Sequence, residues 1–95
     1  MALTPEKKVK NQCVDILKAH EAYYFFPAAN GLGRAGIPDI IACLRGYFIA
    51  IECKAGKGKT TALQDRELQR IRNAGGVALV INENNMDELK SVLSK

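Results

Sequence analysis

The chain has 95 residues, of which 47% are apolar and 25% charged, and this length and balance are those of one small globular domain spanning residues 1–95. No apolar run approaches the roughly 18 residues that a membrane span needs, and the N-terminus carries no apolar signal core, so we expect a cytoplasmic protein. The formal net charge is +4, with basic residues clustered in the middle of the chain. On charge alone, a polyphosphate partner and an ordinary solvated surface explain this cluster equally well.

The three cysteines, Cys13, Cys43 and Cys53, are odd in number and lack CxxC spacing. Two of them fall inside expected strands. We therefore expect small buried thiols in a reducing cytosol, not disulfides or zinc ligands.

The N-terminal segment predicts a helix that begins at Thr4-Pro5, where a capping hydroxyl precedes a proline suited to the first helical position. Apolar residues then recur at helical spacing and define one buried stripe: Val9, Cys13, Ile16 and Leu17. A strand is expected over residues 23–26, because an aromatic run ends there at Pro27. The stretch from Ala28 to Gly36 has the composition of an exposed loop.

Two further strands are predicted at residues 37–44 and 47–53, joined by a tight turn. Residues 61–64 match a capping box and open a second helix, which ends at Gly75-Gly76. Residues 77–81 form an uninterrupted apolar strand, of the kind buried on both faces, and a final helix follows Asn84 or Asn85. The order is α-β-β-β-α-β-α, which predicts an α/β fold with a mixed central sheet flanked by helices.

The hairpin between the second and third strands has a predictable register. With Arg45-Gly46 as the two turn residues, Asp39 stands directly opposite Glu52. Lys54 shares their face, whereas Cys53 points the other way and should lie in the core. Both faces are largely apolar, so we expect the hairpin in the middle of the sheet.

Two adjacent carboxylates at the partly hydrated end of a hairpin are the ligands that a hard divalent cation requires, and Mg²⁺ is the ion we expect. The alternative is purely structural: Glu52 and Lys54 form an edge ion pair, and Asp39 caps a turn. The paired register and the shared face with a lysine favour the metal site.

Two nucleotide-binding motifs are weak here. Residues 31–36 match GxGxxG, but Ile37-Pro38 and an apolar strand follow, where that motif requires a helix. Gly58-Lys59-Thr60 resembles the end of a phosphate-binding loop, but the position five residues before Gly58 is Cys53, not glycine. Residues 56–59 are better interpreted as a mobile basic loop that contacts a nucleic-acid backbone.

Pro38-Asp39, twelve residues and then Glu52-Cys53-Lys54 form the PD-(D/E)XK signature of the restriction-endonuclease-like superfamily. The fuller pattern adds Glu6 in the first helix, residues 34–39 as Arg-Ala-Gly-Ile-Pro-Asp, and Leu63-Gln64 in the next helix. Over nearly its whole length the chain resembles the virus-type replication-repair nuclease (VRR-NUC) domain.

The resemblance implies an endonuclease that hydrolyses DNA phosphodiester bonds with Mg²⁺, for which Mn²⁺ can substitute. The implied metal ligands are Glu6, directly or through water, Asp39, Glu52 and the backbone carbonyl of Cys53. The implied catalytic residues are Asp39, Glu52, Lys54 and Gln64, and the expected DNA contacts are Arg34, Lys57, Lys59 and Arg66. Stand-alone viral members of the family tend to be homodimers that cut branched DNA such as Holliday junctions, so a bacterial or phage-infected cell is the expected setting.

Alternatives remain for several of these assignments. Glu6 can be explained as a first-turn residue of the helix, and Gln64 as the fourth residue of the capping box. The whole chain can be a non-catalytic basic DNA-binding module of the same fold. A phosphate-loop nucleotide-binding protein is the less favoured rival.

Overall fold

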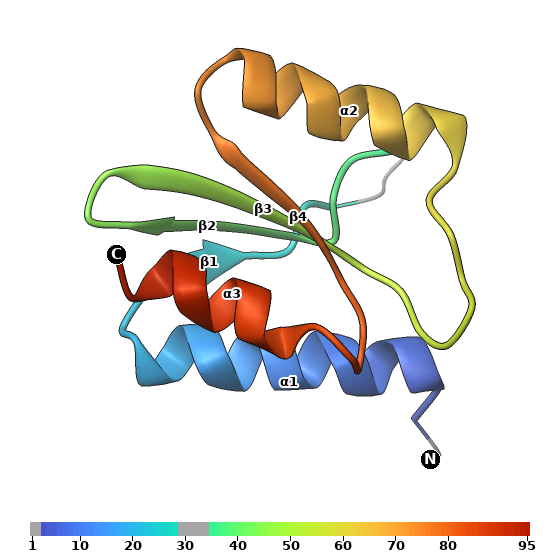
Figure 1. Cartoon of the computed structure of the whole chain (residues 1–95), viewed down its shortest axis with the longest axis horizontal. Helices are drawn as coiled ribbons and strands as arrows, with labels where there is room; N and C mark the ends of the chain where they lie inside the picture. The colour runs from blue at the N-terminus through green and yellow to red at the C-terminus, as the bar shows by residue number, and fades with distance from the viewer. Residues whose placement is uncertain (1–2, 29–34) are drawn as a thin grey trace.

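Four strands form one mixed sheet in the order β1-β2-β3-β4. The computed structural model describes residues 3–28 and 35–95 (Figure 1). The elements in chain order are α1 (Pro5–Ala19), β1 (Tyr23–Phe25), β2 (Ile40–Leu44), β3 (Tyr47–Cys53), α2 (Ala62–Asn73), β4 (Val77–Ile81) and α3 (Met86–Leu93). Strands β1, β2 and β3 pair antiparallel, and β4 pairs parallel to β3. The predicted order and the α/β fold with a mixed sheet are confirmed.

Local capping explains where the first two helices begin. The Thr4 hydroxyl accepts a hydrogen bond from the Lys7 amide, with Pro5 following it at the first helical position of α1. Thr61 and Gln64 form a reciprocal capping box at the start of α2. None of the helices in the described ranges is long and apolar enough to cross a membrane.

The helices cover the two faces of the sheet unequally. Helices α1 and α3 lie together on one face, and α2 lies on the other (Figure 1). The main core forms between the sheet and the α1–α3 pair, and its buried residues are Val9, Cys13, Leu17, Ile40, Ala42, Ile49, Ile51, Cys53, Ile81, Leu89 and Leu93. The predicted burial of Cys53 is confirmed.

Helix α2 leaves part of the sheet face on its side uncovered. Tyr23, Cys43 and Phe48 are neighbours on that face through the strand register, and all three are exposed. The expectation that Cys43 is buried is therefore wrong, because no helix reaches it. Strand β4 lies at the edge of the sheet, with Ala78 and Ile81 fully buried on opposite faces and its other three residues half-buried, so the expected burial on both faces is confirmed in part.

The β2–β3 hairpin has the predicted register and lies in the middle of the sheet. Arg45 and Gly46 both have positive φ, of 51° and 85°, as a type I′ turn requires. The pairs run outward from this turn and end with Ile40 opposite Ile51. Strand β2 thus begins three residues later than predicted, because Asp39 interacts with β3 through its side chain.

Gly36 sets how closely the segment before β2 approaches α2. It has a φ of +85°, and a Cβ added there would lie 2.5 Å from the carbonyl oxygen of Leu63. Only glycine fits this position without moving the backbone. The contact brings the chain leading to Asp39 against the first turn of α2.

We expect Gly36→Ala to lower the free energy of unfolding by about 3 kcal/mol, roughly 1 from the left-handed backbone and roughly 2 from the overlap with Leu63. Gly75→Ala is the matched control, because Gly75 has a φ of +96° with open space around it. It should lower the free energy by only about 1 kcal/mol. Urea denaturation of both variants measures the difference, and equal losses would show that the Leu63 contact is not restrictive.

Candidate active site

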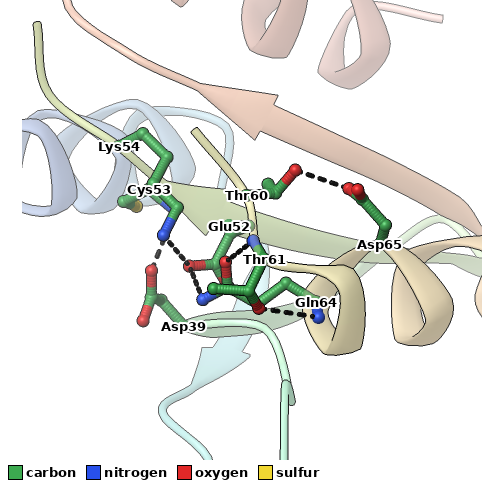
Figure 2. A network of polar contacts seen from close by, with 8 residues as sticks. All are labelled: Asp39, Glu52, Cys53, Lys54, Thr60, Thr61, Gln64 and Asp65. Carbon is green, nitrogen blue, oxygen red and sulfur yellow. Dashed lines mark hydrogen bonds and ion pairs between the residues drawn. The ribbon is translucent and has the colours of Figure 1, made fainter. Parts of the chain in front are cut away.

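Asp39 and Glu52 lie together at the open end of the hairpin. Asp39 directly precedes β2, and its Oδ2 accepts a hydrogen bond from the Cys53 amide at 2.8 Å (Figure 2). This side-chain bond ties the Asp39 carboxylate to the backbone of β3, next to Glu52. The structure therefore brings together the two carboxylates that the sequence register paired.

Glu52 is buried, with only 3% of its surface exposed, and its two oxygens differ. Oε2 accepts a hydrogen bond from Gln64 Nε2 at 3.1 Å and lies 3.7 Å from Lys54 Nζ. Oε1 is buried and has no hydrogen-bond partner among the described residues. A buried carboxylate oxygen without a partner is unfavourable, and a cation at this position would satisfy it.

The environment of Glu52 disfavours its charged form. Burial, followed by the negative charge of Asp39 beside it, raises the pKa of Glu52 to about 8. The Lys54 ammonium opposes this shift, and the more distant negative charge of Glu6 adds to it. Without a cation, this environment therefore favours the protonated form of Glu52.

Gln64 has two roles at once. Its backbone amide donates to Thr61 Oγ1 at 3.2 Å, and its Oε1 accepts from the Thr61 amide at 2.9 Å, so it caps α2. The same side chain uses its Nε2 to hold Glu52. The capping explanation and the location beside the site, which the sequence left as alternatives, are both features of the structure.

The thiol of Cys53 does not belong to the site. A hydrogen bond with the Cys13 thiol, together with burial, raises the pKa of Cys53, so it stays a neutral core thiol. This leaves the backbone of Cys53, and not its sulfur, as the part that can serve the carboxylate pair.

Glu6 lies in the first turn of α1. It lines an open hollow of about 590 Å³ together with Lys54 and Lys59. Across residues 3–28 and 35–95, no group of three or more His, Cys, Asp or Glu residues is placed to hold a metal ion. Glu6 is thus near the carboxylate pair but does not complete a three-residue cage with it.

The expected DNA-contacting residues differ in their surroundings. Lys57 and Lys59 are exposed on the loop between β3 and α2. Arg66 is about half exposed, and its Nε lies 3.8 Å from Glu67 Oε2. Arg34 and most of the GxGxxG match lie outside the described residues.

The phosphate-loop interpretation of Gly58-Lys59-Thr60 meets a physical obstacle. Such a loop needs free backbone amides to bind phosphate. Here the Gly56 amide donates to Glu83, the Gly58 amide to the Ala55 carbonyl, and the Gln64 amide to Thr61. The chain itself occupies these donors.

Sequence reasoning missed two contacts around this loop. Thr60 Oγ1 donates to Asp65 Oδ1, which braces the start of α2 (Figure 2). Glu83 reaches Gly56 from the loop after β4. The only sequence signal for the second contact would have been the parallel pairing of β3 with β4, which brings the loops after both strands to one edge.

Comparisons with known proteins agree with this fold. The chain matches the family model of archaeal Holliday junction resolvase (Hjc) over residues 9–92. A solved VRR_NUC domain is similar over 97% of both chains, with a TM-score of 0.76 and 22% identity. The Hjc of Archaeoglobus fulgidus, a Holliday junction resolvase from an archaeal hyperthermophile, is similar over 81% of this chain and 65% of its own, with a TM-score of 0.59 and 25% identity. Among curated proteins no match is found.

The structural likeness to a VRR_NUC domain confirms the resemblance drawn from the sequence. The family match spans most of the chain, including both carboxylates, Lys54 and Gln64, and leaves only the first turn of α1 and the last residues outside. The protein belongs to the archaeal Holliday junction resolvase (Hjc) family.

Proposed function

We propose that the protein is a divalent-metal-dependent endonuclease that hydrolyses phosphodiester bonds in branched DNA such as four-way junctions. The observation that carries the proposal is the buried Oε1 of Glu52, which lies without a hydrogen-bond partner beside Asp39 among the described residues. Family membership supports a structure-specific nuclease. Mg²⁺ is the proposed metal, with Mn²⁺ as a substitute.

The residues present fit such an ion. Asp39, Glu52 and the Cys53 carbonyl offer oxygen ligands, which hard cations prefer. Mg²⁺ usually binds one or two carboxylates and keeps several waters, so it does not need a cage of three protein side chains. Glu6 would then interact with one of these waters, across the hollow that it lines with Lys54.

Each side chain of the site has a separate task in this mechanism. A bound metal would supply an activated water and neutralise charge on the phosphate. Gln64 holds Oε2 of Glu52, which leaves the buried Oε1 to bind the cation. Lys54, whose side chain is 14% exposed, keeps a fixed positive charge in a partly dry site, where it stabilises the negative charge that grows on the phosphate.

The proposal includes a homodimer. One chain carries one carboxylate pair, and paired cuts in two strands require two such sites related by symmetry. The sheet surface that α2 leaves uncovered exposes Tyr23, Phe25 and Phe48, which gives the chain an apolar surface for self-association. A non-catalytic DNA-binding module is the second candidate function, and loss of turnover with intact binding would favour it.

The first prediction from the proposed function concerns DNA cleavage. The natural protein should make paired, metal-dependent cuts in a labelled four-way junction with Mg²⁺ or Mn²⁺, and none in EDTA. Asp39→Ala and Lys54→Ala should each lower the cleavage rate by at least about a thousandfold, because each removes a group that touches the reacting phosphate or its metal. Asp15→Asn, which changes an exposed acid in the middle of α1, is the control and should cut normally.

Linear duplex and single strand are tested beside the junction. Metal-dependent cutting of those substrates alone would retain the site and reject the preference for branched DNA. Salt-sensitive binding of the junction without cutting under any divalent metal would reject catalysis and leave a binding module.

The second prediction concerns pH. The pKa of Glu52 is raised from 4.5 to about 8, so protonation stabilises the folded state. This stabilisation is complete below pH 4.5 and is lost as the pH rises to 8, by roughly 3–5 kcal/mol. In EDTA, the melting temperature of the natural protein should therefore fall between pH 5 and pH 8 relative to that of Glu52→Gln.

Added Mg²⁺ should restore the melting temperature of the natural protein at pH 8 and leave that of Glu52→Gln unchanged, because bound metal replaces the proton. Parallel melting curves for the two proteins across this pH range would contradict the environment assigned to Glu52.

The third prediction separates the two roles of Gln64. Thr61→Ala removes the hydroxyl cap of α2 but keeps the bond from Gln64 to Glu52, so it should lower the free energy of unfolding by about 1 kcal/mol and leave the cleavage rate within threefold. Gln64→Ala should lower the cleavage rate by about 10–100-fold, the usual effect of losing a group that orients a metal ligand. Equal effects of the two variants on cleavage would show that Gln64 acts only as a cap.

A further inference from the structure

Two loops run side by side beyond the sheet, because the parallel strands β3 and β4 end at the same edge. The Lys54 amide donates to the Ile81 carbonyl at 3.0 Å, which continues the pairing one step past the strands. Two residues farther along each of these segments, the Gly56 amide donates to Glu83 Oε1 at 2.7 Å. The loop that carries the expected DNA-contacting lysines is therefore held by a carboxylate from another part of the chain.

The turn that carries Glu83 is braced by its three asparagines. The Asn82 amide donates to Asn85 Oδ1 at 2.6 Å, and the Asn84 amide donates to Asn82 Oδ1 at 2.8 Å. Asn85 Nδ2 in turn donates to the Val80 carbonyl at 2.9 Å. These bonds fix the backbone on both sides of Glu83, although Glu83 itself is exposed. The Glu83 carboxylate is thus carried by a turn whose backbone is held by hydrogen bonds.

The loop held by Glu83 is a tight turn. The Gly58 amide donates to the Ala55 carbonyl at 2.9 Å, and Gly56 has a φ of +56°. Lys57 lies at the exposed tip of this turn, and Lys59 lines the hollow beside Lys54. The orientation of the turn therefore decides where both lysine side chains stand relative to the carboxylate pair.

We propose that Glu83 is a positioning residue, whose bond to the Gly56 amide orders the 55–59 turn so that Lys57 and Lys59 contact DNA phosphates beside the active site. The inference rests on the proposed function. It adds that an acidic residue strengthens the binding of a polyanion, because the ordering of two lysines outweighs the repulsion of one carboxylate. General electrostatics predicts the opposite sign, since removing an acid near a DNA-binding surface normally tightens binding.

This difference in sign gives the test. Affinity for a synthetic four-way junction is measured in EDTA at several salt concentrations for Glu83→Ala, Glu83→Gln and Asp87→Ala. Glutamine keeps an acceptor oxygen at the same reach without the charge. Asp87 is an exposed acid in the first turn of α3, so its removal makes the same change in net charge and leaves the bond from the Gly56 amide to Glu83 in place.

We expect Glu83→Ala to weaken binding about threefold to tenfold and to reduce the slope of log K against log salt by about 1, as when one phosphate contact is lost. Glu83→Gln should bind within twofold of the natural protein, and Asp87→Ala should bind as well or better. Hydrogen exchange of the Gly56 amide in the free protein should be faster in Glu83→Ala and near normal in Glu83→Gln.

Tighter binding by Glu83→Ala, or an unchanged Gly56 exchange rate, would overturn the inference. A lower melting temperature with an unchanged salt slope would also overturn it, because a purely structural role would not alter the number of phosphate contacts. Cleavage by the natural protein is assayed separately, so normal metal-dependent cutting together with any of these outcomes rejects the role of Glu83 and leaves the nuclease intact.

Discussion

The placement of Asp39 beside Glu52 is the constraint on which the rest of the site depends. A two-residue turn fixes the hairpin register, and this register brings Asp39 and Glu52 side by side, next to the last pair, Ile40 and Ile51. Because Glu52 is buried, their mutual repulsion is poorly screened and must be relieved by a proton or a cation. Lys54 and Gln64 both interact with Oε2 of Glu52, so Oε1 is the oxygen at which a proton or a cation can bind. The repulsion between Asp39 and Glu52 therefore favours a positive charge at one defined position, beside Oε1 of Glu52.

Helix α2 belongs to this site as much as to the fold. Its first turn is capped by the side chain that also holds Glu52, and Gly36 lets the segment before Asp39 pack directly on the peptide at Leu63. The two contacts lie next to each other in the first turn of the helix, one at the Gln64 side chain and one at the peptide between Leu63 and Gln64. A shift of the helix start would therefore disturb the carboxylate pair from two sides. In this small protein, stability and chemistry are not carried by separate parts of the sequence.

Structural features that depend on residues close together in the sequence could mostly be predicted from it. The turn at Arg45-Gly46 was enough to predict the hairpin register and the burial of Cys53, and the capping pattern located Gln64. What it could not specify depends on partners far along the chain. The exposure of Cys43 follows from how much of the sheet α2 covers, which no local pattern encodes. The bond from Glu83 to Gly56 joins residues 27 positions apart and follows from the parallel pairing of β3 with β4.

Arg45 at the hairpin tip ties the middle of the chain to its last helix. It adopts a positive φ that costs a residue with a side chain about 1–2 kcal/mol, and its Nη2 donates to the carbonyls of Leu93 and Lys95 at 2.6 Å each. These acceptors lie 48 and 50 residues further on, so the two bonds form only once α3 lies against the sheet. Until then the strained tip is uncompensated. The end of α3 thus secures a turn that is distant from it in the sequence, and removing residues 93–95 would leave the central turn without these two acceptors.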